Sequence, residues 1–134
     1  MKYPLYGLKK TISGLNYSNN NKGYFMKIAA ACKKDVLSDF SDKNVVFAFF
    51  EIVKNKISSV NEIPFMEGTP EQCADFLVKH EVDLLLAPCL SDEEQNILDK
   101  AGVHLICNLT GSVRTLVEAY IEGSLFDNPK YFIK

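Results

Sequence analysis

Four cysteines are the residues of this 134-residue chain best suited to metal or redox chemistry: Cys32, Cys73, Cys89 and Cys107. No two of them share a C-x-x-C or similar short spacing, so a zinc ribbon is not predicted. Cys32, Cys89 and Cys107 each fall at or near the end of a predicted buried strand, and the carboxyl ends of parallel strands meet at one edge of a sheet. Because thiolates are natural ligands of iron–sulfur clusters, these three cysteines are the candidate metal ligands.

The surroundings of the cysteines define the rest of the candidate site. Ser91 and Asn108 lie in the same strand-end loops and join Cys32 and Cys89 as candidate cofactor-binding residues. Cys73 falls on the apolar face of a predicted helix, so we assign it to the core. The alternative for the other three is also open, because buried cysteine commonly acts as a small hydrophobe. His80 and His104 are interpreted as structural residues rather than ligands.

The sequence does not predict an enzyme. A two-metal nuclease needs clustered carboxylates, yet the predicted first strand, residues 26–32, contains none. The nearest candidate acids, Asp35, Asp39 and Asp42, are confined to one loop. Asp83 starts a different strand, at the end opposite to that loop. A Cys–His nucleophile would need a histidine beside Cys89, but both histidines lie toward the amino-terminal sides of their strands. Glycine patterns for phosphate or dinucleotide binding are absent.

The first half of the predicted fold consists of strands. Residues 26–32 form an apolar run of small side chains that suits a buried strand, and residues 33–44 read as a polar loop. Residues 45–53 are aromatic and β-branched, which strongly favours a strand. The turn Lys54-Asn55-Lys56 then predicts an antiparallel hairpin whose second arm, residues 57–63, lies at a sheet edge.

After Gly68 helices and strands alternate. Capping boxes at Thr69–Gln72 and Ser91–Glu94 predict two helix starts. Residues 82–87 and 103–107 are the strands between and after these helices, and a third helix ends at Gly123. Strand–helix–strand steps imply parallel pairing. We therefore predict an α/β fold with helices packed on a mixed five-stranded sheet, with the elements in the order βββαβαβα.

Charge and composition divide the chain into three segments. Residues 1–24 form a polar, Asn-rich extension, residues 25–126 the domain, and residues 127–134 a tail. Residues 1–34 hold seven lysines and no acid, whereas the remainder carries a charge of -9. This arm is interpreted as a solvated extension, with contact to RNA or a partner as the alternative. A short strand or a helical turn in the arm could pack its apolar residues onto the body: Tyr3, Leu5, Tyr6, Leu8, Ile12 and Leu15.

The composition indicates the class of the protein and its expected location in the cell. With 47% hydrophobic and 24% charged residues and a net charge of -2, it is typical of a globular protein with no general affinity for nucleic acid or membranes. No apolar run approaches the roughly 18 residues of a membrane helix. The amino terminus also lacks the apolar core of a signal peptide, so we expect a cytoplasmic location.

From residue 26 to residue 125 the chain resembles the dinitrogenase iron–molybdenum cofactor biosynthesis family. The resemblance rests on an ordered set of segments: MKIAAACKKDVLSDF, FAFFEIVKNKISSVNEIPF, ADFLVKHEVDLLLAP, LSDEEQNILDKAGVHLI and TGSVRTLVEAYIEGSLF. It implies a ribonuclease H-like layer and a role in carrying or assembling iron–sulfur-based metal cofactors. It also implies docking to a metalloenzyme or to a cofactor-assembly protein.

The chain departs from the family at two positions. Many relatives carry a His-Phe-Gly motif after the first strand, where this chain keeps Phe40 but has no histidine. Relatives often have a glycine-rich turn where this chain has Pro88-Cys89-Leu90-Ser91, which adds a thiol and removes backbone freedom. We therefore expect a non-catalytic carrier or scaffold for an iron–sulfur-based cluster or an iron–molybdenum cofactor precursor. The alternative is an interaction or regulatory domain of this fold that no longer binds the cofactor.

Overall fold

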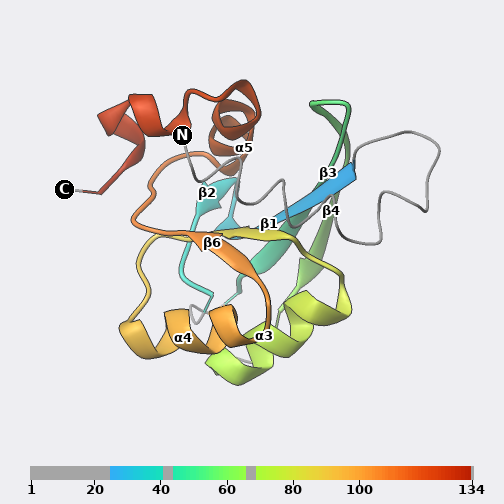
Figure 1. Cartoon of the computed structure of the whole chain (residues 1–134), viewed down its shortest axis with the longest axis vertical. Helices are drawn as coiled ribbons and strands as arrows, with labels where there is room; N and C mark the ends of the chain where they lie inside the picture. Colours follow the sequence, from blue (N-terminus) through green and yellow to red (C-terminus); the bar gives the residue numbers. More distant parts are fainter. Residues whose placement is uncertain (1–24, 41–43, 66–68, 134) are drawn as a thin grey trace.

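The structure is a computed structural model that describes residues 25–40, 44–65 and 69–133. A mixed sheet with helices on both faces makes up this part of the chain (Figure 1). The strands are β1 (Phe25–Lys33), β2 (Val36–Leu37), β3 (Val46–Val53), β4 (Lys56–Pro64), β5 (Leu84–Leu86) and β6 (His104–Ile106). The helices are α3 (Pro70–Lys79), α4 (Asp92–Lys100) and α5 (Val113–Glu122), followed by the 3-10 turns η1 (Leu125–Asp127) and η2 (Pro129–Tyr131).

The sheet has the order β4-β3-β1-β5-β6, with β2 paired to β1. β1 is antiparallel to β3 over its whole length, from Phe25 opposite Val53 to Cys32 opposite Val46. β5 is parallel to both β1 and β6, so it lies between them. The predicted parallel trio and antiparallel hairpin are therefore confirmed. The long pairings belong to the hairpin side of the sheet, whereas the β5 and β6 pairings extend over three residues each.

Side chains on the two faces of the sheet form two separate cores. On one face Ile28, Ala30 and Cys32 of β1 pack with α5. On the other face Ala29 and Ala31 pack with residues of α3 and α4. Figure 1 shows α5 on one side of the sheet and α3 and α4 on the other. Alternation along one strand therefore decides which layer of helices a side chain meets.

Local sequence signals begin and end the helices as predicted. Thr69 and Ser91 cap α3 and α4, each in a complete capping box. Gly123 ends α5 in the left-handed conformation with φ of 83°. The hairpin turn holds Lys54 and Asn55 at positive φ, which matches the twist of the flanking strands.

The structure differs from the sequence prediction in three details. Residues 33–44, predicted as a loop, contain β2, because Lys34 and Asp35 turn at positive φ and return the chain to pair with β1. The sheet consequently has six strands rather than five. The strands predicted at 82–87 and 103–107 span three residues each, and the N–H groups of Val82 and Val103 donate to carbonyls of α3 and α4 rather than to a neighbouring strand.

The segment after residue 126, expected as a tail, returns to the sheet. Phe132 forms an isolated bridge with Leu109, and the N–H of Ile133 donates to the carbonyl of Asn108. Residues 1–24, predicted as an extension, lie outside the described residues. No helix in the described ranges is long and apolar enough to cross a membrane.

Candidate functional site

Cys89 and Cys107 lie together at the carboxyl ends of β5 and β6. The strands bring their loops together through two backbone bonds: Asn108 donates to the carbonyl of Pro88, and Leu109 donates to that of Ala87. Cys89 is exposed and Cys107 is half-buried. Two thiols of different accessibility are therefore held at one edge of the sheet, where ligands of open α/β sheets commonly bind.

The Cys89 thiol contributes to the electrostatics of Cys107. Burial is the largest cause that raises the pKa of the Cys107 thiol, and the nearby Cys89 raises it further. A hydrogen bond from its own backbone N–H acts in the opposite direction. A cation bound between the two sulfurs would offset their mutual repulsion, because it favours both thiolates.

The structure places Cys32 on the opposite face of the sheet from Cys107. Cys32 is 2% exposed and packs in the core beneath α5, whereas Cys107 packs toward the α3 and α4 side of the sheet. β5 also separates β1 from β6, so the two residues are about 10 Å apart across the sheet. Burial, followed by the Glu62 charge, raises the pKa of the Cys32 thiol. A buried thiol that stays protonated is a poor ligand and a poor nucleophile.

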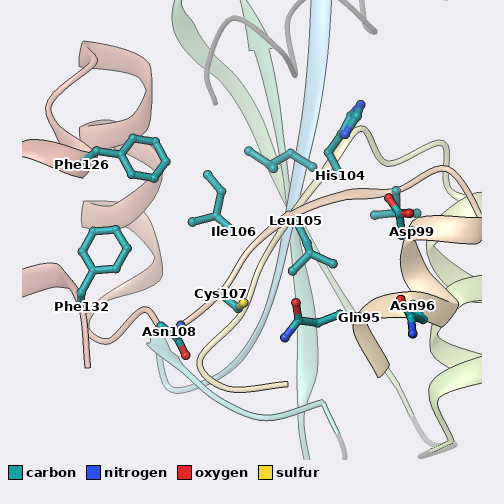
Figure 2. A pocket seen from close by; sticks show the side chains of 12 residues that line it. Gln95, Asn96, Asp99, His104, Leu105, Ile106, Cys107, Asn108, Phe126 and Phe132 are labelled. Carbon is teal, nitrogen blue, oxygen red and sulfur yellow. The ribbon is translucent and has the colours of Figure 1, made fainter. Parts of the chain in front are cut away.

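The two polar candidates have other structural roles. Ser91 is the N-cap of α4: its hydroxyl accepts from the N–H of Glu94, and its own N–H donates to the Glu94 carboxylate. Asn108 sits at positive φ, and its backbone links Pro88 to Ile133. The Asn108 side chain lies beside Cys107 (Figure 2). Asn108 is therefore placed to contact a ligand at the thiol pair, while the Ser91 hydroxyl already has a hydrogen-bond role.

The remaining candidate ligands do not complete a larger set. Within residues 25–40, 44–65 and 69–133, no three histidine, cysteine or acidic side chains are grouped so as to hold a metal ion. Cys73 is fully buried, and burial raises its pKa to about 12. His80 ends α3 and stacks on Phe49 with 5.1 Å between ring centroids. The described part of the chain thus offers two thiols at one place rather than a closed ligand shell.

Solved structures with the same fold include proteins named in connection with dinitrogenase. PH0822 superposes with a TM-score of 0.65 at 17% identity, over 73% of this chain and 92% of that one. A protein of Methanocaldococcus jannaschii, named as a dinitrogenase candidate, superposes with a TM-score of 0.59 at 22% identity, over 74% and 90% of the two chains. A Thermotoga protein, named as a NifB candidate of the DUF35 family, gives 0.57 at 22% identity, over 81% and 97%. At these identities the chain shares the fold of these proteins.

Two comparisons at the level of sequence found no match. No family model matches the chain. No curated protein matches it either.

A groove runs along the outer edge of β6 and reaches Cys107. Its volume is about 580 Å³. Polar residues of α4 form one wall and two aromatic residues from the end of the chain form the other (Figure 2). We call this the β6 groove and define it by β6 with Gln95, Asn96, Asp99, Cys107, Phe126 and Phe132.

The β6 groove is a feature that the sequence reasoning missed. Phe132 fell in the segment expected as a tail, and Phe126 at the end of the domain. The available signal was the apolar spacing of residues 125–133, with Leu125, Phe126, Tyr131, Phe132 and Ile133. In the structure the Phe126 and Phe132 rings lie 5.9 Å apart between centroids. The two rings meet because the chain turns back on itself after Phe126. The spacing of apolar residues in the sequence does not reveal such a turn.

Proposed function

We propose that this chain is a non-catalytic carrier or scaffold domain that takes up an iron–sulfur-based cofactor or its precursor as cargo at Cys89 and Cys107. The proposal is supported by one observation above all: the strand ends bring an exposed and a half-buried thiol together at one edge of the sheet. Thiolates are the ligands that such clusters prefer. The shared fold of the dinitrogenase-named structures is consistent with this role.

Two protein thiolates would leave the cargo open to other ligands. Iron in such clusters is held by about four protein ligands. A site with two must take the others from a partner protein or from small thiols, so the cargo remains exchangeable. This arrangement suits transfer to a metalloenzyme or to a cofactor-assembly protein in the cytoplasm, where thiols stay reduced.

Cys32 is excluded from the proposed ligand set, although the sequence argument included it. Its side chain faces the core under α5, on the opposite side of the sheet from Cys107. Cys32 therefore provides a matched control: it is a cysteine of the same chain, at the end of a neighbouring strand, whose removal should leave cargo binding unchanged.

Anaerobic reconstitution with iron and sulfide tests the proposal. The full chain should retain iron after desalting, with the visible absorption of thiolate-bound iron. Cys89→Ser and Cys107→Ser should each lower the retained iron by about tenfold or more, since each removes a ligand. Cys32→Ala should retain iron at the level of the unchanged protein.

Two outcomes would contradict this assignment. Equal iron retention in Cys89→Ser and the unchanged chain would show that the pair is not the ligand set. Loss of iron in Cys32→Ala, with its melting transition intact, would restore Cys32 as a ligand.

An interaction domain without cofactor is the second candidate, and the β6 groove favours it. Edge strands beside apolar grooves are common docking sites for extended peptides. Under this alternative no variant, nor the unchanged chain, would retain iron above the level of a chain without accessible thiols.

A further inference from the structure

β6 is an open edge of the sheet. It pairs with β5 on one side, and no strand among the described residues pairs with it on the other. His104 donates to the carbonyl of Asp83, and the carbonyl of Ile106 accepts from Ala87, so these two residues face β5. In a parallel pair the residue between them turns its N–H and C=O away. Leu105 therefore presents an N–H and a carbonyl to a further strand.

The two edges of the sheet differ in chemistry. β4, at the other edge, carries Lys56, Glu62 and Pro64, which are residue types that discourage pairing with another strand. β6 consists of His104, Leu105 and Ile106 and has neither lysine nor proline. An apolar edge of this kind is commonly covered in native proteins.

The two walls of the β6 groove differ in polarity, and this difference determines which side chains a covering strand would need. A strand added beside β6 would point alternate side chains to opposite faces. On one face it would meet Phe126 and Phe132, which are apolar. On the other it would meet Gln95, Asn96 and Asp99 of α4 (Figure 2). Asp92 lies one turn before Asn96 on the same side of the helix and adds a second negative charge.

We propose that the amino-terminal segment of this chain, residues 5–11, docks in the β6 groove as an additional strand. The centre of its sequence, LYGLKKT, has the required alternation: Tyr6 and Leu8 fall on one face with Lys10 at its end, and Gly7 and Lys9 fall on the other with Leu5 at its start. Tyr6 and Leu8 would pack against Phe126 and Phe132. Lys9 would face the opposite charge of Asp99. Pro4 precedes this segment, at a position where a strand tolerates proline.

Charge favours this occupant over a second copy of the body. Residues 1–24 hold four lysines and no acid, whereas residues 25–134 hold 11 basic and 17 acidic residues and carry a net charge of -6. A second copy would bring the acidic α4 helices of two molecules toward one another at the groove. A basic segment of the same chain instead offsets that charge, at a high effective concentration set by the linker.

The intervening chain is long enough to reach. β6 lies two strand spacings from β1, so a strand beyond it lies about 14 Å from β1. Residues 12–24 can span up to about 43 Å when extended. Their sequence, ISGLNYSNNNKGY, is rich in Asn, Ser and Gly, a composition typical of a connecting segment.

Amide hydrogen exchange of the full chain, followed residue by residue by NMR, tests the proposal without any metal. The Leu105 N–H should be protected when residues 5–11 are docked. Leu8→Asp should speed its exchange by about tenfold or more, because the substitution places a charge against Phe126 and Phe132. The Ile106 N–H, which faces β5, should keep its protection and provides the internal control.

Two control variants and a charge reversal identify the contact. Leu15→Asp makes the same change outside the docking segment and should leave the exchange of Leu105 unaltered. Lys9→Glu should speed the exchange of the Leu105 N–H, whereas Lys22→Glu should leave it unaltered. Asp99→Lys combined with Lys9→Glu should restore protection, because the opposite charges are exchanged between the two positions.

Three results would overturn the proposal. The first is exchange of the Leu105 N–H in the full chain at the rate of an unpaired edge. The second is protection that survives Leu8→Asp and Lys9→Glu. The third is protection that rises with protein concentration, which would assign the edge to a second copy. The readout is a backbone amide, so failure here and failure of iron binding at Cys89 and Cys107 are distinguishable.

Discussion

At the scale of single residues, alkylation should separate the four thiols by burial. Cys89 is exposed and should react first, and Cys107 is half-buried and should follow. Cys32 and Cys73 should stay protected until the protein unfolds, because burial raises both pKa values, that of Cys73 to about 12. Mass spectrometry after timed labelling measures the order. Rapid labelling of Cys32 in the native protein would contradict the placement of its thiol under α5.

Tyr120 carries a hydroxyl that the core does not satisfy. Its side chain is 6% exposed, and its oxygen has no hydrogen-bond partner among the described residues. Tyr120→Phe removes an unsatisfied buried group at nearly constant shape, so the free energy of unfolding should rise by about 1 kcal/mol. Chemical denaturation at neutral pH measures it. A loss of stability of similar size would show that the hydroxyl is paired in solution.

The same residue makes the fold sensitive to alkali. Burial raises the pKa of Tyr120 to about 12, from an ordinary value of 10.0. Unfolding therefore releases this proton above pH 10, and the stability present below pH 10 falls as the pH rises toward 12. Tyr120→Phe should reduce that fall, which denaturation curves across this pH range would show. An identical fall in both proteins would assign the alkaline sensitivity to other groups.

At the scale of elements, two helix starts offer a matched comparison. Ser91 caps α4 with a hydrogen bond to the Glu94 N–H, so Ser91→Ala should lower stability by about 1 kcal/mol. Ser112 begins α5 without a side-chain cap bond, and its hydroxyl makes only a long 3.5 Å contact with Asp35. Ser112→Ala should therefore lower the free energy of unfolding by much less. Chemical denaturation of both variants under the same conditions measures the difference. Equal losses would mean that the capping bond of Ser91 contributes little.

At the scale of the whole molecule, the body should fold without residues 1–24. The two buried cores consist of residues from Met26 to Leu125. A chain that begins at residue 25 should keep one cooperative melting transition, since a strand added at an edge contributes far less burial than these cores. Thermal melts of the full and shortened chains measure this. Loss of the transition on shortening would show that the segment completes the core itself.

The β3–β4 hairpin and the parallel pairing of β5 with β6 were predictable because they follow from local signals. The aromatic run before Lys54-Asn55 and the two capping boxes each act over a few residues, and parallel pairing follows from strand–helix–strand order. The exposure of Cys89 also agrees with its position in a loop beyond a proline. β2 was missed because its pairing depends on the positive φ of Lys34 and Asp35, neither of which is glycine.

The sequence by itself determined the hairpin, the helix starts and which residue types lie at the ends of the strands. Only the tertiary structure decided which of those side chains meet. Cys32 and Cys107 both end parallel strands, yet alternation and the presence of β5 between their strands place them on opposite faces. Phe126 and Phe132 meet because the chain after α5 folds back against Leu109. Strand ends are local properties, whereas the face to which a side chain points depends on register across the sheet, and that is set by packing between distant segments.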